Sequence, residues 1–207
     1  MPKIFSEAER DLVRRRLLDA GQESIIRQGL RKTKVEELTM TVGIAKGTFY
    51  NFFPSKEALC LALLEEAESA RQAAIAGLLA RGLPAADTMR ELLLWGFRLA
   101  RENSLMRVLL QRDEYRLLVR TLPAEALAAH QAEDEAEMRA LFQHFGIQDD
   151  QVVRIGTAFI RSLFLLCLHE NEIGPRLMPE LEILYAGMAG DWVAKMLGGG
   201  YQEATHG

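Results

Sequence analysis

The residues best suited to a chemical role stand in one short segment in the first quarter of the chain. Lys46, Thr48 and Asn51 bring hydrogen-bonding groups close together, and Tyr50 adds a phenol. Gly47 stands among them and leaves space for another molecule to approach the backbone. These groups are of the kinds that bond phosphate oxygens or the edges of nucleic-acid bases.

Two short helices are expected to position these groups. Thr33 and Glu36 have the spacing of a capping box, which predicts the start of the first helix. Gly43 lies in the tight turn that follows, and Pro54 stops the second helix. Lys56 begins a third, longer helix, where free amides attract a phosphate. This is the pattern of a helix-turn-helix, whose second helix enters the major groove, although a simple helical hairpin with a solvated face has the same spacing.

The residues from Gly29 to Glu57 resemble, without a gap, the DNA-binding region of TetR-type (tetracycline-repressor-like) transcriptional regulators. The most specific part is the run GIAKGTFYNFFPSKE that starts at Gly43, and the likeness extends over about residues 12–64. It departs from the family pattern before Gly43, where Thr-Met-Thr-Val replaces the usual Ala-x-x-Ala, and at Lys34, where a second Thr is common. The DNA-contacting residues implied by the resemblance are Thr33, Lys34, Ala45, Lys46, Gly47, Thr48, Tyr50, Asn51 and Lys56.

Charge and composition agree with a DNA-binding segment on a soluble body. Residues 1–56 hold eleven Lys or Arg and seven Asp or Glu, a net charge of +4, whereas the rest of the chain carries −8. Such a basic segment favours a polyanionic partner. The two cysteines are far apart, which excludes a disulfide scaffold. No apolar run approaches the about 20 residues of a membrane span, and no apolar signal core opens the chain, so we expect a cytoplasmic protein without membrane contact.

Pro and Gly divide the sequence into helix-length blocks, which predicts an all-α fold of about nine helices. We expect a helix-turn-helix domain over residues 1–54, a helical-bundle body for effector binding and dimerisation over residues 55–197, and a flexible tail over residues 198–207. The expected helices cover about residues 6–28, 33–43, 45–52, 55–81, 85–102, 105–121, 124–145, 149–171 and 180–197.

The body offers candidates for a ligand pocket. The block from Met89 to Ala100 is apolar nearly all round, as in a central helix. The candidate lining residues are Met89, Trp95, Phe97, Tyr115, Phe142 and Phe159. For each of them taken singly, packed core is the favoured interpretation. Such a lining predicts a moderately hydrophobic, uncharged small-molecule effector, oriented by Tyr115 or by an arginine such as Arg98 or Arg112.

The last two long helices carry apolar residues on more than one face. One face can pack on the bundle, and the other then needs a second subunit, unless both helices are interior helices of a monomer. In the family, these two helices form a four-helix dimer interface. The expected interface residues are Phe164, Leu168, Leu184, Met188, Trp192 and Met196.

The sequence lacks the motifs of an enzyme. His130 with Glu133 and Asp134 has the spacing of metal ligands on a helix, but a solvated charged face explains it better. We therefore predict no catalytic residues, no cofactor and no metal site. The predicted function is that of a homodimeric repressor on palindromic double-stranded operator DNA, with an effector that tilts the long helix from Ser55. An activator of the same fold and a helical bundle that binds ligand or metal without DNA are the alternatives.

Overall fold

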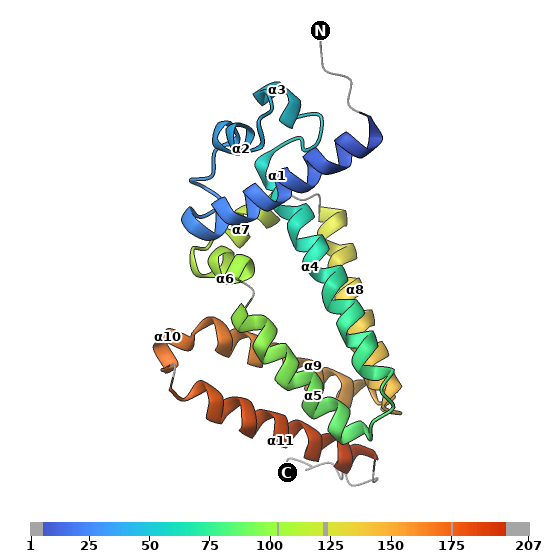
Figure 1. Cartoon of the computed structure of the whole chain (residues 1–207). Coiled ribbons are helices and arrows are strands. Elements are labelled where there is room, and N and C mark those ends of the chain that lie inside the picture. Colours follow the sequence, from blue (N-terminus) through green and yellow to red (C-terminus); the bar gives the residue numbers. More distant parts are fainter. Residues whose placement is uncertain (1–5, 103, 122–123, 175, 198–207) are drawn as a thin grey trace. The chain divides into compact units, whose positions relative to one another are not determined.

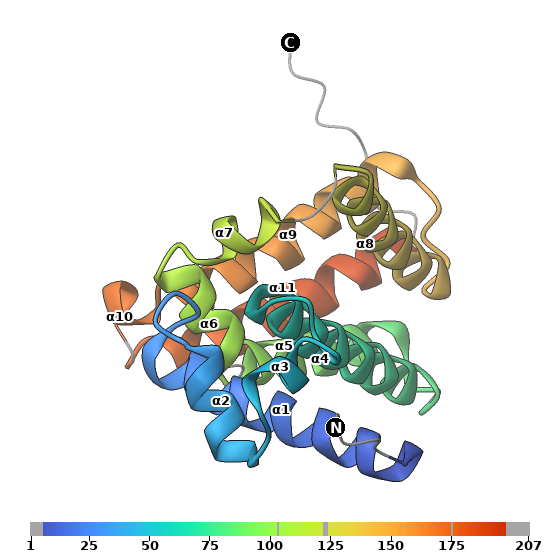
Figure 2. The ribbon, with the colours of Figure 1, turned by 90° about the horizontal axis from the view of Figure 1, so that it is seen from above.

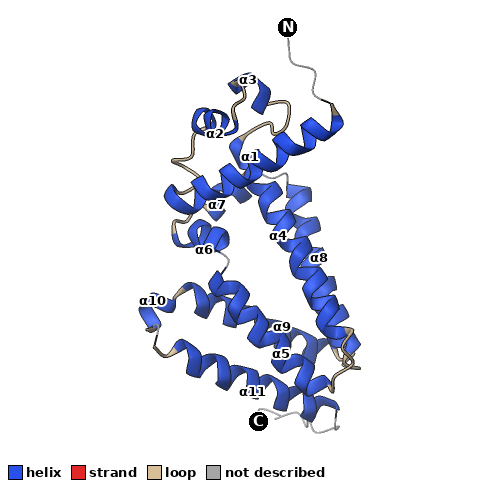
Figure 3. Ribbon diagram, in the orientation of Figure 1, coloured by secondary structure: helices blue, strands red, loops and turns tan. Residues whose placement is uncertain are grey.

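The computed structural model describes residues 6–102, 104–121, 124–174 and 176–197, and every regular element in these ranges is an α-helix (Figure 3). The all-α fold is therefore confirmed. The helices are α1 (Glu7–Gln28), α2 (Val35–Val42), α3 (Lys46–Phe49), α4 (Lys56–Leu79), α5 (Ala85–Glu102), α6 (Ser104–Gln111), α7 (Tyr115–Val119), α8 (Ala124–His144), α9 (Asp150–Leu168), α10 (Glu170–Ile173) and α11 (Met178–Leu197).

Two of the expected helices are each divided in the structure. The block predicted over residues 105–121 is broken between α6 and α7, where Asp113 takes a left-handed backbone conformation with φ 54°. Aspartate tolerates this conformation better than most residues. The block predicted over residues 149–171 is divided at His169, which ends α9 and precedes α10. The expected tail over residues 198–207 lies outside the described residues.

The helices expected to begin at Ser6 and at Thr33 are capped differently in the structure. Ser6 caps α1 through a complete capping box, in which its hydroxyl accepts from the Glu9 amide and its amide donates to the Glu9 carboxylate. The capping box predicted for Thr33 is wrong, because Lys34 is the N-cap of α2 and makes no side-chain cap. Thr33 is buried, and its hydroxyl instead donates to the Gly29 carbonyl at 2.8 Å.

The described chain forms two compact units. The first holds α1, α2, α3, the part of α4 up to Gln72, α6 and α7. The second holds the part of α4 from Ala73, together with α5, α8, α9, α10 and α11. The first unit is thus larger than the segment 1–54 expected for DNA binding, because a distant part of the chain packs against it.

The first unit is built around α1. Figures 1 and 2 show α2 and α3 next to each other, and α1 packs against both α2 and α6. Its fully buried side chains come from every helix of the unit, so α6 and α7 share one core with the helices near the N-terminus. These side chains are Leu17, Leu18, Ile25, Leu30, Leu38, Phe49, Leu59, Leu109 and Leu118.

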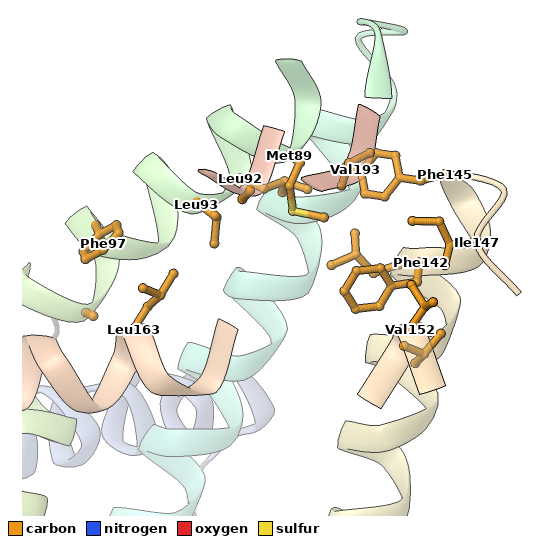
Figure 4. Packing of buried hydrophobic residues seen from close by; sticks show 14 of the residues in the cluster. Met89, Leu92, Leu93, Phe97, Phe142, Phe145, Ile147, Val152, Leu163 and Val193 are labelled. Atoms are coloured by element: carbon orange, nitrogen blue, oxygen red, sulfur yellow. The ribbon is translucent and has the colours of Figure 1, made fainter. Parts of the chain in front are cut away.

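The core of the second unit lies between α5, α8, α9 and α11, and α5 and α11 run side by side (Figures 1 and 2). Met89, Phe97 and Leu163 lie in this core, as Figure 4 shows. Phe142 is fully buried there and meets Trp192 edge to face, with the ring centroids 5.7 Å apart. Gly156 of α9 leaves room for this pair, because a Cβ at Gly156 would lie 2.3 Å from Phe142 and 2.8 Å from Trp192.

We expect Gly156→Ala to lower the free energy of unfolding by about 1–3 kcal/mol, because two aromatic rings must move to admit one methyl group. Gly96→Ala in α5 is the matched control, because a Cβ there would meet no atom within 4 Å. That variant should gain up to about 1 kcal/mol from helix propensity. Urea unfolding followed by circular dichroism measures both, and equal midpoints for the two variants would contradict the packing described for Gly156.

Candidate nucleic-acid interface

The turn between α2 and α3 is formed by Gly43, whose backbone is left-handed with φ 76°. The amides of Gly43 and Ile44 both donate to the Thr39 carbonyl, at 2.9 and 3.0 Å, so the end of α2 is closed by hydrogen bonds. Ala45 is then the N-cap of α3. A helix-turn-helix is therefore present where the sequence predicted it, with a second helix of four residues in place of the expected 45–52.

The short α3 is fixed by one aromatic anchor. Phe49 is completely buried and packs at 5.9 Å from the Phe53 ring. Tyr50 meets the Phe49 ring edge on at 5.4 Å and remains about half exposed. Because Phe49 faces the core, the polar residues on either side of it are turned outward.

The outward face of α3 collects most of the predicted DNA-contacting residues. Ala45, Lys46, Gly47, Tyr50 and Asn51 are exposed, and Thr48, on the same segment, is half-buried. A Cβ at Gly47 would meet no atom of the chain within 4 Å. The fold itself therefore does not require a glycine at this position.

The Lys46 ammonium donates a hydrogen bond to the Glu36 carboxylate at the surface. This hydrogen bond lowers the pKa of the Glu36 carboxyl and raises the pKa of the Lys46 ammonium. Both side chains are more than half exposed, so water screens the pair and its contribution to stability is small. Lys46 is thus held as a cation next to the open backbone of Gly47.

Two arginines of α1 hold the segment that follows α3, and no motif in the sequence pointed to them. The Arg10 guanidinium donates to the Asn51 carbonyl at 3.2 Å and lies over the Phe52 ring at 5.2 Å. Arg14 lies over the Phe53 ring at 5.1 Å. The excess of basic residues in this part of the chain was the available signal, but it did not show which of them would meet an aromatic ring.

Lys56 has a different role from the phosphate contact predicted for it. Its ammonium donates to the carbonyls of Leu30, Arg31 and Thr33, at 2.7, 2.9 and 3.0 Å. An ammonium has three protons to donate, so this loop takes all of them. Thr33 is buried at 2% exposure, and Lys34 is exposed. Lys56 and Thr33 therefore shape the loop, whereas Lys34 keeps its side chain at the surface.

The structure divides the predicted ligand-pocket residues between the two cores. Met89, Phe97 and Phe142 are buried in the core of the second unit, and Phe159 packs against it. Trp95 on α5 is half-buried. Tyr115 instead packs against the core of the first unit, because it begins α7.

The predicted dimer residues also fall into different environments. Leu184 and Met188 are exposed on α11, where a partner can reach them. Trp192 and Met196 are half-buried and pack against the core of their own chain, and their part in an interface stays a prediction. The side chains of Phe164 and Leu168, like that of His130, lie outside the described residues.

Metal binding, thiol chemistry and membrane insertion find little support in the described part of the chain. No group of three His, Cys, Asp or Glu side chains lies close enough there to hold a metal ion. Burial raises the pKa of the Cys60 thiol to about 12, which keeps it protonated and unreactive near neutral pH. None of the described helices is both long and apolar enough to span a bilayer.

Comparison with known family models finds one match, in the first third of the chain. Residues 17–63 match the family model of the bacterial regulatory proteins of the tetR family. No curated protein sequence matches the chain.

Solved structures match it over nearly its whole length. A putative TetR-family regulator from Mesorhizobium loti MAFF303099 has a TM-score of 0.67 at 19% identity, covering 92% of this chain and 98% of its own. A TetR-like regulator from Rhodococcus sp. RHA1 has a TM-score of 0.58 at 16% identity, covering 95% and 100%. The regulator FadR from Bacillus subtilis, in complex with stearoyl-CoA, has a TM-score of 0.56 at 16% identity, covering 91% and 99%.

These matches confirm the resemblance to TetR-type regulators. The match of residues 17–63 to the tetR-family model fits the helix-turn-helix described above. The chain as a whole has the fold of TetR-like transcriptional regulators.

We expect Lys56→Met to lower the free energy of unfolding by about 1–3 kcal/mol, because three carbonyls lose a charged donor and two of these hydrogen bonds are partly buried. Lys34→Met is the matched control, and because Lys34 is well exposed, it should change stability by no more than about 0.5 kcal/mol. Thermal unfolding measures both variants. If Lys56→Met unfolds like the wild type, the ammonium does not hold the loop in solution.

Proposed function

We propose that this protein is a homodimeric repressor that binds operator DNA through the exposed face of α3. The observation that carries the proposal is the open surface at Gly47, next to the Lys46 ammonium, on a helix anchored by the buried Phe49 ring. A cation and a bare backbone side by side suit the close approach of a phosphate backbone. The second helix of a helix-turn-helix is also the element that enters the major groove.

The polar residues of this surface divide into two roles in the proposal. Lys46, Thr48 and Tyr50 bind phosphates, and Lys34 adds a further cation at the N-terminus of α2. Asn51 bonds a base edge or fixes the position of α3, since an amide can both donate and accept. Because Lys56 is occupied by carbonyls of its own chain, we leave it out of the DNA-binding set.

The proposed dimer forms through apolar residues that the single chain leaves exposed. Ile183, Leu184 and Met188 lie exposed on α11, and Ile155 and Leu165 lie exposed on α9. Exposed apolar side chains gathered on two long helices are typical of a subunit interface. Two copies would present two α3 helices to two half-sites of a palindromic operator.

An apolar small molecule is the proposed effector, and the core of the second unit is its proposed site. In that core Met89, Phe97 and Phe142 are buried and Phe159 packs against it, and all four side chains are apolar. Two solved neighbours are named for ligands with an apolar or weakly polar part. One is the FadR complex with stearoyl-CoA, whose acyl chain is apolar although its CoA moiety is charged, and the other is a gamma-butyrolactone receptor. An effector that prefers one arrangement of α4 would shift the operator affinity, since a ligand acts only through its different affinity for two states.

We expect Gly47→Ala to weaken operator binding by at least about tenfold, or about 1.4 kcal/mol, because a methyl group would project toward the DNA. The variant should be as stable as the wild type or up to about 1 kcal/mol more stable, because the site is open within the chain. Operator fragments selected from genomic DNA, followed by fluorescence anisotropy, measure the affinity. Gly77→Ala in α4 is the control, since a Cβ there is also free of contacts. Equal operator affinity of the two variants would contradict the proposed contact between α3 and the DNA.

We expect Met188→Glu to convert a dimer into a monomer that keeps its helix content but loses specific DNA affinity, because a carboxylate would be buried against a partner. Leu12→Glu is the matched control, since Leu12 is exposed to the same extent, 51% against 50%, on α1. Sedimentation velocity at micromolar concentration separates the two states. A wild-type monomer under these conditions, or a dimeric Met188→Glu variant, would contradict the proposed interface.

A further inference from the structure

A buried carboxylate ties two distant parts of the first unit together. Glu114 is only 4% exposed, and it lies between α6 and α7. Its carboxylate accepts hydrogen bonds from the backbone amides of Leu30 at 2.6 Å and Arg31 at 3.2 Å, more than eighty residues away in sequence. Those amides belong to the loop that joins α1 to α2.

The carboxylate is held in place by the fold of its own segment. Asp113 turns the chain with its positive φ, and the Glu114 amide donates to the Leu109 carbonyl at 2.8 Å. Leu109 and Leu118, on either side of Glu114, are fully buried in the core that α1 also shares. The position of Glu114 is therefore set by core packing and not by the loop that it binds.

The backbone of the loop between α1 and α2 leaves room for the Glu114 carboxylate. Gly29 has φ 88°, a conformation that L residues with a side chain rarely adopt. A Cβ at Gly29 would also lie 2.8 and 2.9 Å from the two oxygens of Glu114. Gly29 is therefore required both by the backbone conformation and by the closeness of the carboxylate.

The same loop is held through its carbonyl groups by Lys56. The ammonium binds the carbonyls of Leu30 and Arg31, whereas the carboxylate binds the amides of these same two residues. Charge-assisted hydrogen bonds are about twice as strong as neutral ones. Because Lys34, the N-cap of α2, stands three residues after Arg31, the placement of this loop determines where α2 enters the helix-turn-helix.

We infer that Glu114 is a positioning residue of the DNA-binding surface, which fixes α2 and α3 from the segment between α6 and α7. The inference rests on the proposed function, since it assigns to Glu114 an effect on operator affinity. It makes α6 and α7 part of the DNA-reading unit, although they follow the helix-turn-helix by about fifty residues or more in sequence. A shift of this segment would move the loop and thereby change the operator affinity.

The test uses Glu114→Gln in the full-length protein, because this variant keeps the size of the side chain but removes its charge and one acceptor. Amide hydrogen exchange at Leu30 and Arg31 should accelerate at least tenfold. Operator affinity of the folded protein should fall at least tenfold, whereas affinity for DNA of unrelated sequence should remain unchanged. A loss of stability alone would not produce this difference between specific and non-specific DNA.

Leu63→Ala in α4 is the control for stability, because it removes a buried side chain of the same core without touching the loop. At a temperature where both variants are fully folded, Leu63→Ala should keep the operator affinity of the wild type. Lys56→Met is the second variant, and it should reproduce the loss of specific affinity if Glu114→Gln does not fold. The inference is overturned if the amides of Leu30 and Arg31 exchange as slowly in a folded Glu114→Gln variant as in the wild type. It is also overturned if the operator affinity of Glu114→Gln equals that of Leu63→Ala.

The two proposals fail in different ways. If the wild-type protein binds no DNA in preference to unrelated sequence, the proposed function fails, and the role of Glu114 in DNA binding falls with it. The exchange measurement then still shows whether the carboxylate holds the loop. If the wild type binds its operator and Glu114→Gln binds equally well, only the positioning role is wrong.

Discussion

The arrangement of the first unit depends on the hydrogen bonding of one loop between α1 and α2. This loop carries Leu30 with a completely buried side chain, so its backbone groups need partners within the protein. Glu114 supplies the acceptor, Lys56 supplies the donor, and the Thr33 hydroxyl bonds the Gly29 carbonyl.

The short α3 illustrates why such external support is needed. A helix of four residues is too short to be stable by itself, since helix formation needs a costly nucleus. Its place is determined by the Phe49 side chain, the closed turn at Gly43 and the arginines of α1 that meet the residues after it. The polar side chains of α3 are therefore not needed to fix the helix in place and remain available for a partner.

Local signals in the sequence predicted the elements well and the long-range contacts poorly. The bounds of α5, the extent of α1 and the glycine turn at Gly43 follow from residues close in sequence, and the structure confirms them. Lys56 was expected at a phosphate because its local position suits one. Its actual partners lie 23 to 26 residues away, and those of Glu114 lie 83 and 84 away. Such pairings leave no periodic pattern, so only the fold reveals them.

The dependence of the α1–α2 loop on Glu114 limits how modular the helix-turn-helix segment is. A chimera that grafts residues 1–54 onto another body leaves behind the carboxylate of Glu114 and also the ammonium of Lys56. The amides of Leu30 and Arg31 would then face a foreign surface, and the space beside Gly29 would lose the Glu114 carboxylate that occupies it. A transferable unit of this protein therefore has to be discontinuous, with the α6–α7 segment carried along with the N-terminal helices.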